Sequence, residues 1–306
     1  MLNRYIIGIV MGLCMGAAGS LQAQVHPLYS QYMHDATAIN PAYAGSADAL
    51  TLSLHGRMQW ISADGAPTNQ ILSAHTPLPG SRLVAGLRLQ HESVGSGRRM
   101  QLSPALGYRL PVGKGHISSG LSANINRYTP GYRNLLIYHD DDAVFALQES
   151  QWVVTLGTGL YYESPLMNIG LSVPEILPAT RPDQERSIFS RHLRQYVFHA
   201  GRAIPLGADV VLKPNVLLSV PERGAAYADA NLNVLFRNAL WLGASYRSTQ
   251  QLAGLVQLQL NAQWRLGYSW DMPLREQQGY GSDTHEISLQ YSFIFDRSAV
   301  RSPRYF

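Results

Sequence analysis

The chain has 306 residues, of which 14% are charged and 46% hydrophobic, with a formal net charge of +4. This charged share is low for a soluble domain, where about a quarter of residues carry charge. The weak positive charge, without a basic patch interleaved with aromatic side chains, gives no support to a nucleic-acid partner. No run of about 18 apolar residues follows the N-terminal region, so we expect no transmembrane helix in the mature chain.

Residues 1–23 have the features of a signal peptide. Arg4 supplies the positive start, residues 5–19 form an apolar core too short to span a bilayer, and cleavage is expected after Ala23. The one cysteine, Cys14, lies in this core. The exported chain would therefore have no disulfide, and its stability must come from strand pairing and packing.

Residues 24–48 show no strand pattern and are expected to form a periplasmic N-terminal segment. Asn40-Pro41 and Ala44-Gly45-Ser46 are turn-forming sequences that would fold it back before the first strand. A flexible leader is the alternative. Several apolar anchors argue against it, namely Tyr29, Tyr32, Met33, Ile39 and Tyr43.

Residues 49–295 alternate between apolar and polar side chains, as in Leu50, Leu52 and Leu54 against Thr51 and Ser53. Period-two alternation over about ten residues is typical of tilted membrane strands. About fourteen strands are predicted, at 49–60, 68–77, 82–92, 99–110, 116–128, 151–162, 166–173, 194–204, 208–219, 226–236, 239–247, 252–260, 262–271 and 284–295.

The predicted connections are alternately short and mostly longer, and those at 129–150 and 174–193 are the longest. An even-stranded barrel with tight periplasmic turns and larger outer loops has this parity, whereas a soluble β-sandwich has no reason to keep it. We therefore expect an all-β, transmembrane antiparallel β-barrel in the bacterial outer membrane. Pro104 and Pro214 fall inside predicted strands, which implies a bulge or a wrong register there.

One predicted face is apolar and has aromatic side chains near the strand ends, as expected of a lipid-facing wall. These aromatics are Tyr108, Tyr128, Trp152, Tyr162, Tyr196, Trp264, Trp270 and Phe295. The other face carries both signs of charge, which could pair across a narrow lumen. These charged residues are Arg57, Arg88, Arg109, Lys213, Arg247, Arg265, Asp209, Asp229, Asp271 and Glu286. We favour a lumen filled by side chains, with the N-terminal segment as a further contributor, over an open channel.

Residues 296–306 form a predicted periplasmic tail with Arg301, Pro303, Arg304, Tyr305 and Phe306. The tail is expected to dock a periplasmic partner. Capping of the barrel floor, or recognition during barrel insertion, is an equal alternative.

The sequence contains little that predicts catalysis, a cofactor or a metal site. The acidic run at 139–142 is better read as a solvated loop than as a calcium site. A Ser288–His285 hydrolase pair is disfavoured, because alternation places the two on opposite faces. We expect no enzymatic activity.

Three blocks of sequence resemble the PorP/SprF family of type IX secretion proteins of Bacteroidetes. They are SQY…INPAYAGS from Ser30, QW…DGAP…SAHTP from Gln59, and the SPRYF ending. The resemblance implies an outer-membrane barrel that supports secretion or surface anchoring of client proteins with a C-terminal sorting domain, including gliding adhesins.

The same resemblance implies contacts with periplasmic ring or motor subunits and brings no catalytic residues. The alternative function is a channel or transporter for small or hydrophobic solutes. The expected partners also include outer-membrane lipid. Beyond the tail, the candidate partner-binding residues are Tyr32, Asn40, Pro41, Tyr43, Gly45, Trp60, Asp64, Gly65 and Pro67.

Overall fold

The computed structural model describes residues 29–61, 63–131, 150–176, 194–222, 224–274 and 283–293. Within these ranges the chain forms one sheet of fifteen strands, preceded by a short 3-10 helix, η1 (Pro41–Tyr43). The strands are β1 (Leu50–Met58), β2 (Thr68–Pro77), β3 (Leu83–Val94), β4 (Gly97–Val112), β5 (Gly115–Thr129), β6 (Gln151–Ser164), β7 (Met167–Val173), β8 (Gln195–Arg202), β9 (Ile204–Pro205), β10 (Val210–Pro221), β11 (Tyr227–Phe236), β12 (Leu240–Arg247), β13 (Gln251–Gln259), β14 (Trp264–Pro273) and β15 (Thr284–Phe293).

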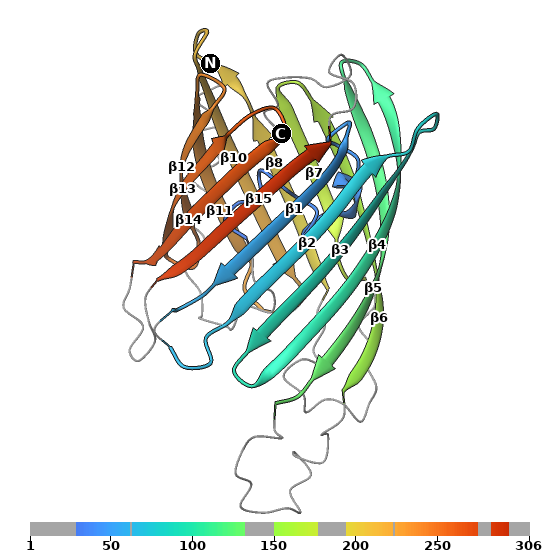
Figure 1. The fold of residues 1–306 in the computed structure, drawn as a ribbon, viewed down its shortest axis with the longest axis vertical. Helices are drawn as coiled ribbons and strands as arrows, with labels where there is room; N and C mark the ends of the chain where they lie inside the picture. Colours follow the sequence, from blue (N-terminus) through green and yellow to red (C-terminus); the bar gives the residue numbers. More distant parts are fainter. Residues whose placement is uncertain are drawn as a thin grey trace, which may run out of the picture.

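The sheet closes on itself. β1 pairs antiparallel with β2 on one side and with β15 on the other, from Leu50 opposite Phe293 to Met58 opposite His285. Every described strand except β9 belongs to this ring, which is therefore a fourteen-stranded antiparallel barrel (Figure 1). Closure leaves no strand edge, as a sheet in lipid requires. The predicted fold class is confirmed, and each predicted strand end within the described residues lies within two residues of an observed one.

Side-chain alternation separates a polar interior from an apolar outer wall. In β1, Thr51 and Ser53 are buried, while Leu54 and Met58 are 51% and 50% exposed on the outside. Such outward apolar residues occur around the barrel, where lipid would cover them. Trp152 and Trp270 lie on this outer face as predicted, but Tyr128 does not. Tyr128 is buried against the lumen, where the guanidinium of Arg99 lies 5.8 Å from its ring centroid.

The two prolines interrupt the hydrogen-bond ladders without changing the register. The β4–β5 ladder has a gap between Leu102 opposite Ile125 and Ala105 opposite Ser122, so the residue count is equal on both strands. Pro214 interrupts the ladder that β10 forms with β8 and β9 in the same way. The gap divides the predicted strand 194–204 into β8 and the two-residue β9. Proline has no N–H to donate, which accounts for both gaps, and the expected bulge or register error is wrong.

The connections differ at the two ends of the barrel. At one end, the short-turn end, the connections span 78–82, 113–114, 165–166, 206–209, 237–239 and 260–263. At the other, the long-loop end, they include 130–150 and 174–194, although 95–96 and 248–250 are as short as turns. β1 begins and β15 ends at the short-turn end (Figure 1). In the described part of the chain, no helix has the length and hydropathy to cross a membrane.

Candidate functional site: a lumen filled by the N-terminal segment

The interior of the barrel is occupied by residues 29–49, which we call the plug (Figure 1). Ser30 contacts Arg57 near the long-loop end of β1, and Gly45 contacts His75 near the short-turn end of β2. The plug therefore runs along the lumen before it enters β1. No residue from 29 to 49 is exposed. Of the predicted periplasmic segment 24–48, the described residues 29–48 lie within the barrel, where the favoured filled lumen allowed for them.

The plug packs its apolar side chains against the inner wall. Tyr32, Met33, Ile39 and Tyr43 are each at most 5% exposed and form one cluster with wall residues. The wall residues of this cluster are Tyr161, Val197, Leu217, Tyr227, Ala253 and Leu255. Burial of these side chains is favourable in proportion to the apolar area removed from water, and here it replaces a conventional core.

At its first residues the plug completes a buried charge cluster. The Ser30 hydroxyl donates to Asp271 at 2.8 Å and accepts from Arg57 and Arg247. The backbone N–H groups of Ser30 and Gln31 donate to Glu286 at 3.0 and 3.2 Å. We call this arrangement the Ser30 clamp.

The charges of the clamp explain why the plug is needed. Arg57 pairs with Asp271 and Glu286, and Arg247 pairs with Asp229 and Asp271, so two cations face three carboxylates. The plug adds donors to this excess of negative charge, including the Tyr32 hydroxyl on Asp229 at 3.2 Å. Because a buried charge without a partner is costly, removal of the plug would destabilise the wall around it.

A second polar contact holds the plug beside β1 and β2. Asp35 accepts from the backbone and hydroxyl of Thr37 at 2.9 and 2.6 Å and from Ser73 at 3.3 Å, and it lies 3.3 Å from His55 Nε2. The buried Asp35 carboxyl thus has partners both within the plug and on the wall.

Wall side chains also bond to the plug backbone at mid-length. Lys213 Nζ donates to the Met33 carbonyl at 3.0 Å and lies 5.6 Å from the Trp241 ring centroid. Arg88 donates to Ala38 O at 2.8 Å, and Ser172 to Ile39 O at 2.6 Å. An irregular segment in a closed lumen must find partners for its carbonyls, and these side chains supply them.

The short-turn end of the plug is fixed by Gly45 and Arg109. Gly45 has φ +76°, and a Cβ there would lie 2.4 Å from Val84 Cγ1, so only glycine fits this position. Arg109 donates to the Gly45 carbonyl at 3.3 Å and also pairs with Asp48 and with Glu163. The predicted turn at Asn40-Pro41 is present as η1, with the Asn40 side chain accepting from Ala42 N.

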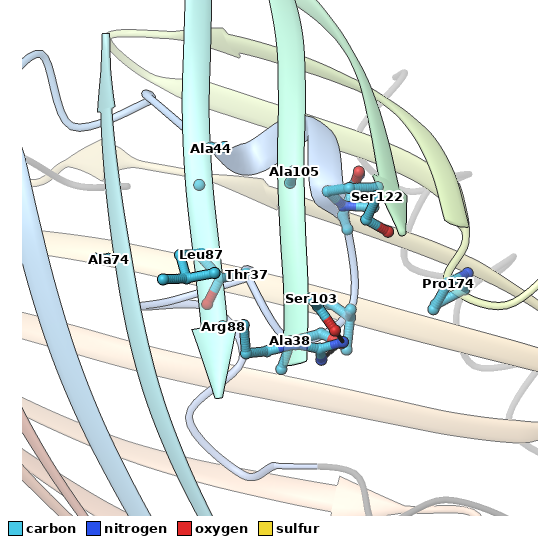
Figure 2. A pocket seen from close by; sticks show the side chains of 14 residues that line it. Thr37, Ala38, Ala44, Ala74, Leu87, Arg88, Ser103, Ala105, Ser122 and Pro174 are labelled. Atoms are coloured by element: carbon cyan, nitrogen blue, oxygen red, sulfur yellow. Dashed lines mark hydrogen bonds between the residues drawn. The ribbon is translucent and has the colours of Figure 1, made fainter. Parts of the chain in front are cut away.

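Little free space remains where the plug meets β2 to β5. A cavity of about 30 Å³ lies between residues 37–41 and 44 of the plug and wall residues including Arg88 and Ser103 (Figure 2). This is room for one or two water molecules. A pocket for a drug-sized ligand would be about ten times larger.

The structure separates the predicted partner-binding residues into two groups. Tyr32, Asn40, Pro41, Tyr43 and Gly45 lie in the plug, where they contact the inner wall rather than the surface. Trp60, Asp64, Gly65 and Pro67 lie in the connection 59–67 at the long-loop end. Residues 301–306 are outside the described part of the chain.

Connection 59–67, which we call the β1–β2 rim, is held in place from both sides. Gly65 O accepts from Gly95 N at 2.8 Å, and Ile61 N donates to Asp283 O at 3.2 Å. Asp64 and Gly65 are exposed. The described rim residues, 59–61 and 63–67, thus have fixed contacts on both sides and lie at the surface.

Several functional contacts were not foreseen from sequence. Six of the ten predicted lumen charges form ion pairs, namely Arg57, Arg109, Arg247, Asp229, Asp271 and Glu286. Arg88, Lys213 and Arg265 donate hydrogen bonds to uncharged groups, and Asp209 is exposed in the connection 206–209. Ser30, Asp35 and the Arg99 pairs with Glu92 and Glu175 were missed. Arg99 was missed because the predicted strand began at that residue, although its inward position follows from alternation with Gln101.

Ser288 and His285, the disfavoured hydrolase pair, lie on opposite faces of β15. His285 is on the outer face with Nδ1 2.7 Å from the Tyr268 hydroxyl, while Ser288 is buried inside and donates to Gln31. Within the described ranges, no group of three or more His, Cys, Asp or Glu side chains could hold a metal ion. The acidic run at 139–142 lies outside those ranges.

Solved structures define the class of protein. The "CymD monoaromatic hydrocarbon channel" is 12% identical, with a TM-score of 0.51 over 91% of this chain and 96% of that one. The Ralstonia pickettii toluene transporter TbuX is 9% identical, with a TM-score of 0.50 over 87% of this chain and 94% of that one. At such identities the likeness concerns the fold alone. With the closed, outwardly apolar wall, it shows that this protein has the fold of outer-membrane β-barrels.

The family follows from the sequence. Residues 21–291 match the model described as "Type IX secretion system membrane protein PorP/SprF", and the chain belongs to this family. The match covers most of the chain and confirms the family resemblance. It includes the first two sequence blocks, whereas the SPRYF ending at 302–306 lies beyond it. No curated protein matches the chain.

Proposed function

We propose that this chain is a non-enzymatic component of the type IX secretion apparatus. It supports secretion or surface anchoring of client proteins rather than conducting solutes. Family membership supports the assignment to the apparatus. The filled lumen favours a docking function over conduction of solutes. No residue of the plug is exposed, and the two ends of the plug are bonded to opposite ends of the barrel.

The orientation that we propose places the short-turn end in the periplasm and the long-loop end outside. Outer-membrane barrels have short periplasmic turns and longer outer loops. The exported chain would reach this position after cleavage of residues 1–23. Periplasmic ring or motor subunits would contact the short-turn end and the tail 296–306. A client with a C-terminal sorting domain, such as a gliding adhesin, would contact the β1–β2 rim.

Charge reversal at each end of the barrel tests this division. Asp64→Lys changes the exposed rim, and Lys114→Asp changes an exposed residue of the short turn 113–114. Wild type and each variant are affinity-tagged and purified separately from membranes of cells that contain the whole apparatus. The proteins that co-purify with each are then identified. We expect Asp64→Lys to lose a large surface protein and keep the ring subunits.

Lys114→Asp is the matched control, because it has the opposite charge change at the opposite end. It should retain the surface protein. The proposal is contradicted if wild type recovers neither ring subunits nor a surface protein. The proposal is also contradicted if a strain that lacks the protein loses solute uptake but still secretes normally. That result would favour the channel.

A further inference from the structure

The outer wall of β4 to β6 carries two exposed arginines at its long-loop end, of which Arg127 donates a hydrogen bond to Ser150 at 3.5 Å. Arg98 and Arg127 both point outward and are exposed, and within the described residues neither pairs with an acidic side chain. The acidic residues of the neighbouring strands, Glu92 and Glu163, face inward and pair with lumen arginines. Among the described residues, this part of the outer wall therefore has a positive charge without an acidic partner.

The register places the two arginines next to one another. Arg98 is opposite Thr129, and Arg127 is opposite Met100, so Arg98 and Arg127 are diagonal neighbours on one face. Diagonal neighbours have Cβ atoms about 7–8 Å apart, which allows two long guanidinium side chains to bind one phosphate.

An aromatic residue marks the depth of the pair. Trp152 is opposite Arg127 in the register, is 67% exposed, and has its ring centroid 5.7 Å from the Arg127 guanidinium carbon. Exposed tryptophans gather at the membrane–water interface. Beyond the arginines, the outward residues become apolar at Leu102 and Val154.

We propose that Arg98 and Arg127 bind the phosphate of an anionic lipid headgroup, with its acyl chains against Met100, Leu102 and Val154. Cations beside an interfacial aromatic, above an apolar wall, are complementary to a phosphate attached to hydrocarbon. In the proposed orientation this leaflet is the outer one. The inference rests on the proposed function only in so far as it takes this orientation from it.

The test uses purified wild-type barrel in neutral detergent, titrated with bis-phosphorylated lipid A and followed by native mass spectrometry. Arg98→Gln/Arg127→Gln should weaken retention of lipid A by about tenfold or more, because it removes charge-assisted hydrogen bonds. The control is Arg82→Gln/Arg202→Gln, which removes two exposed arginines at the short-turn end. Its retention should match wild type. Heat-dependent gel mobility shows that each variant is a folded barrel.

Two further arms identify the ligand. Lipid A stripped of phosphate should bind wild type no better than it binds the Arg98→Gln/Arg127→Gln variant. Inorganic phosphate at the same concentration should not displace lipid A. Equal retention by all variants, equal loss in the control pair, or full displacement by inorganic phosphate would each overturn the proposal. Because no secretion partner is present, failure here leaves the proposed function untouched.

Discussion

At the scale of single residues, Ser30 links the plug to the charged side chains of the wall. Its side chain is fully buried and joins Asp271, Arg57 and Arg247. Ser30→Ala leaves these charged groups with one partner fewer, and a hydrogen bond to a charged group contributes about 1.5–3 kcal/mol. We expect the free energy of unfolding in detergent to fall by about 2 kcal/mol, measured as a lower urea midpoint by tryptophan fluorescence.

Ser119→Ala is the control for Ser30→Ala. Ser119 lies outward on β5 and is exposed to lipid, so loss of its hydroxyl should leave the midpoint within about 0.5 kcal/mol of wild type. Equal midpoints for both variants would mean that the Ser30 clamp does not hold the plug.

At the scale of elements, the location of the plug can be tested by a disulfide. A Cβ on Gly86 of β3 would lie 3.1 Å from the Ala44 Cβ, slightly closer than the roughly 3.5–4.5 Å of a disulfide. We expect Ala44→Cys/Gly86→Cys to oxidise in membranes, with loss of free thiols and a linked peptide in mass spectrometry. The one native cysteine, Cys14, lies in the predicted signal peptide, and replacing it with serine leaves only the introduced pair.

The matched pair for this cross-link is Ala44→Cys/Leu89→Cys. Leu89 lies on the same strand but faces outward, with 45% exposure. This pair should keep both thiols free. If both pairs oxidise at the same rate, or neither does, the plug does not lie where the structure has it.

The strands were predictable from sequence because each has one polar and one apolar face, and a period of two is a strong local signal. The plug was harder. Asn40-Pro41 and Gly45 predicted its turns, but its place in the lumen depends on residues such as Glu286 and Lys213, which are distant in sequence. The effect of Pro214 was also missed, because a ladder gap without a bulge leaves alternation unchanged on both sides.

At the scale of the whole molecule, the account depends on a barrel that is closed around its wall and filled along its axis. The wall satisfies the backbone in lipid, while the plug and the lumen charges satisfy one another. A variant lacking residues 29–48 would lose this second set of contacts. We expect it to be less stable than wild type and, where it folds, to leave a polar passage.

The most direct test of this account is the conductance of purified protein in a planar lipid bilayer. We predict that wild type gives no steady current above the bare bilayer, and that the variant lacking residues 29–48 gives discrete openings where gel mobility shows a folded barrel. A large, steady current from wild type would contradict the sealed lumen and favour a channel.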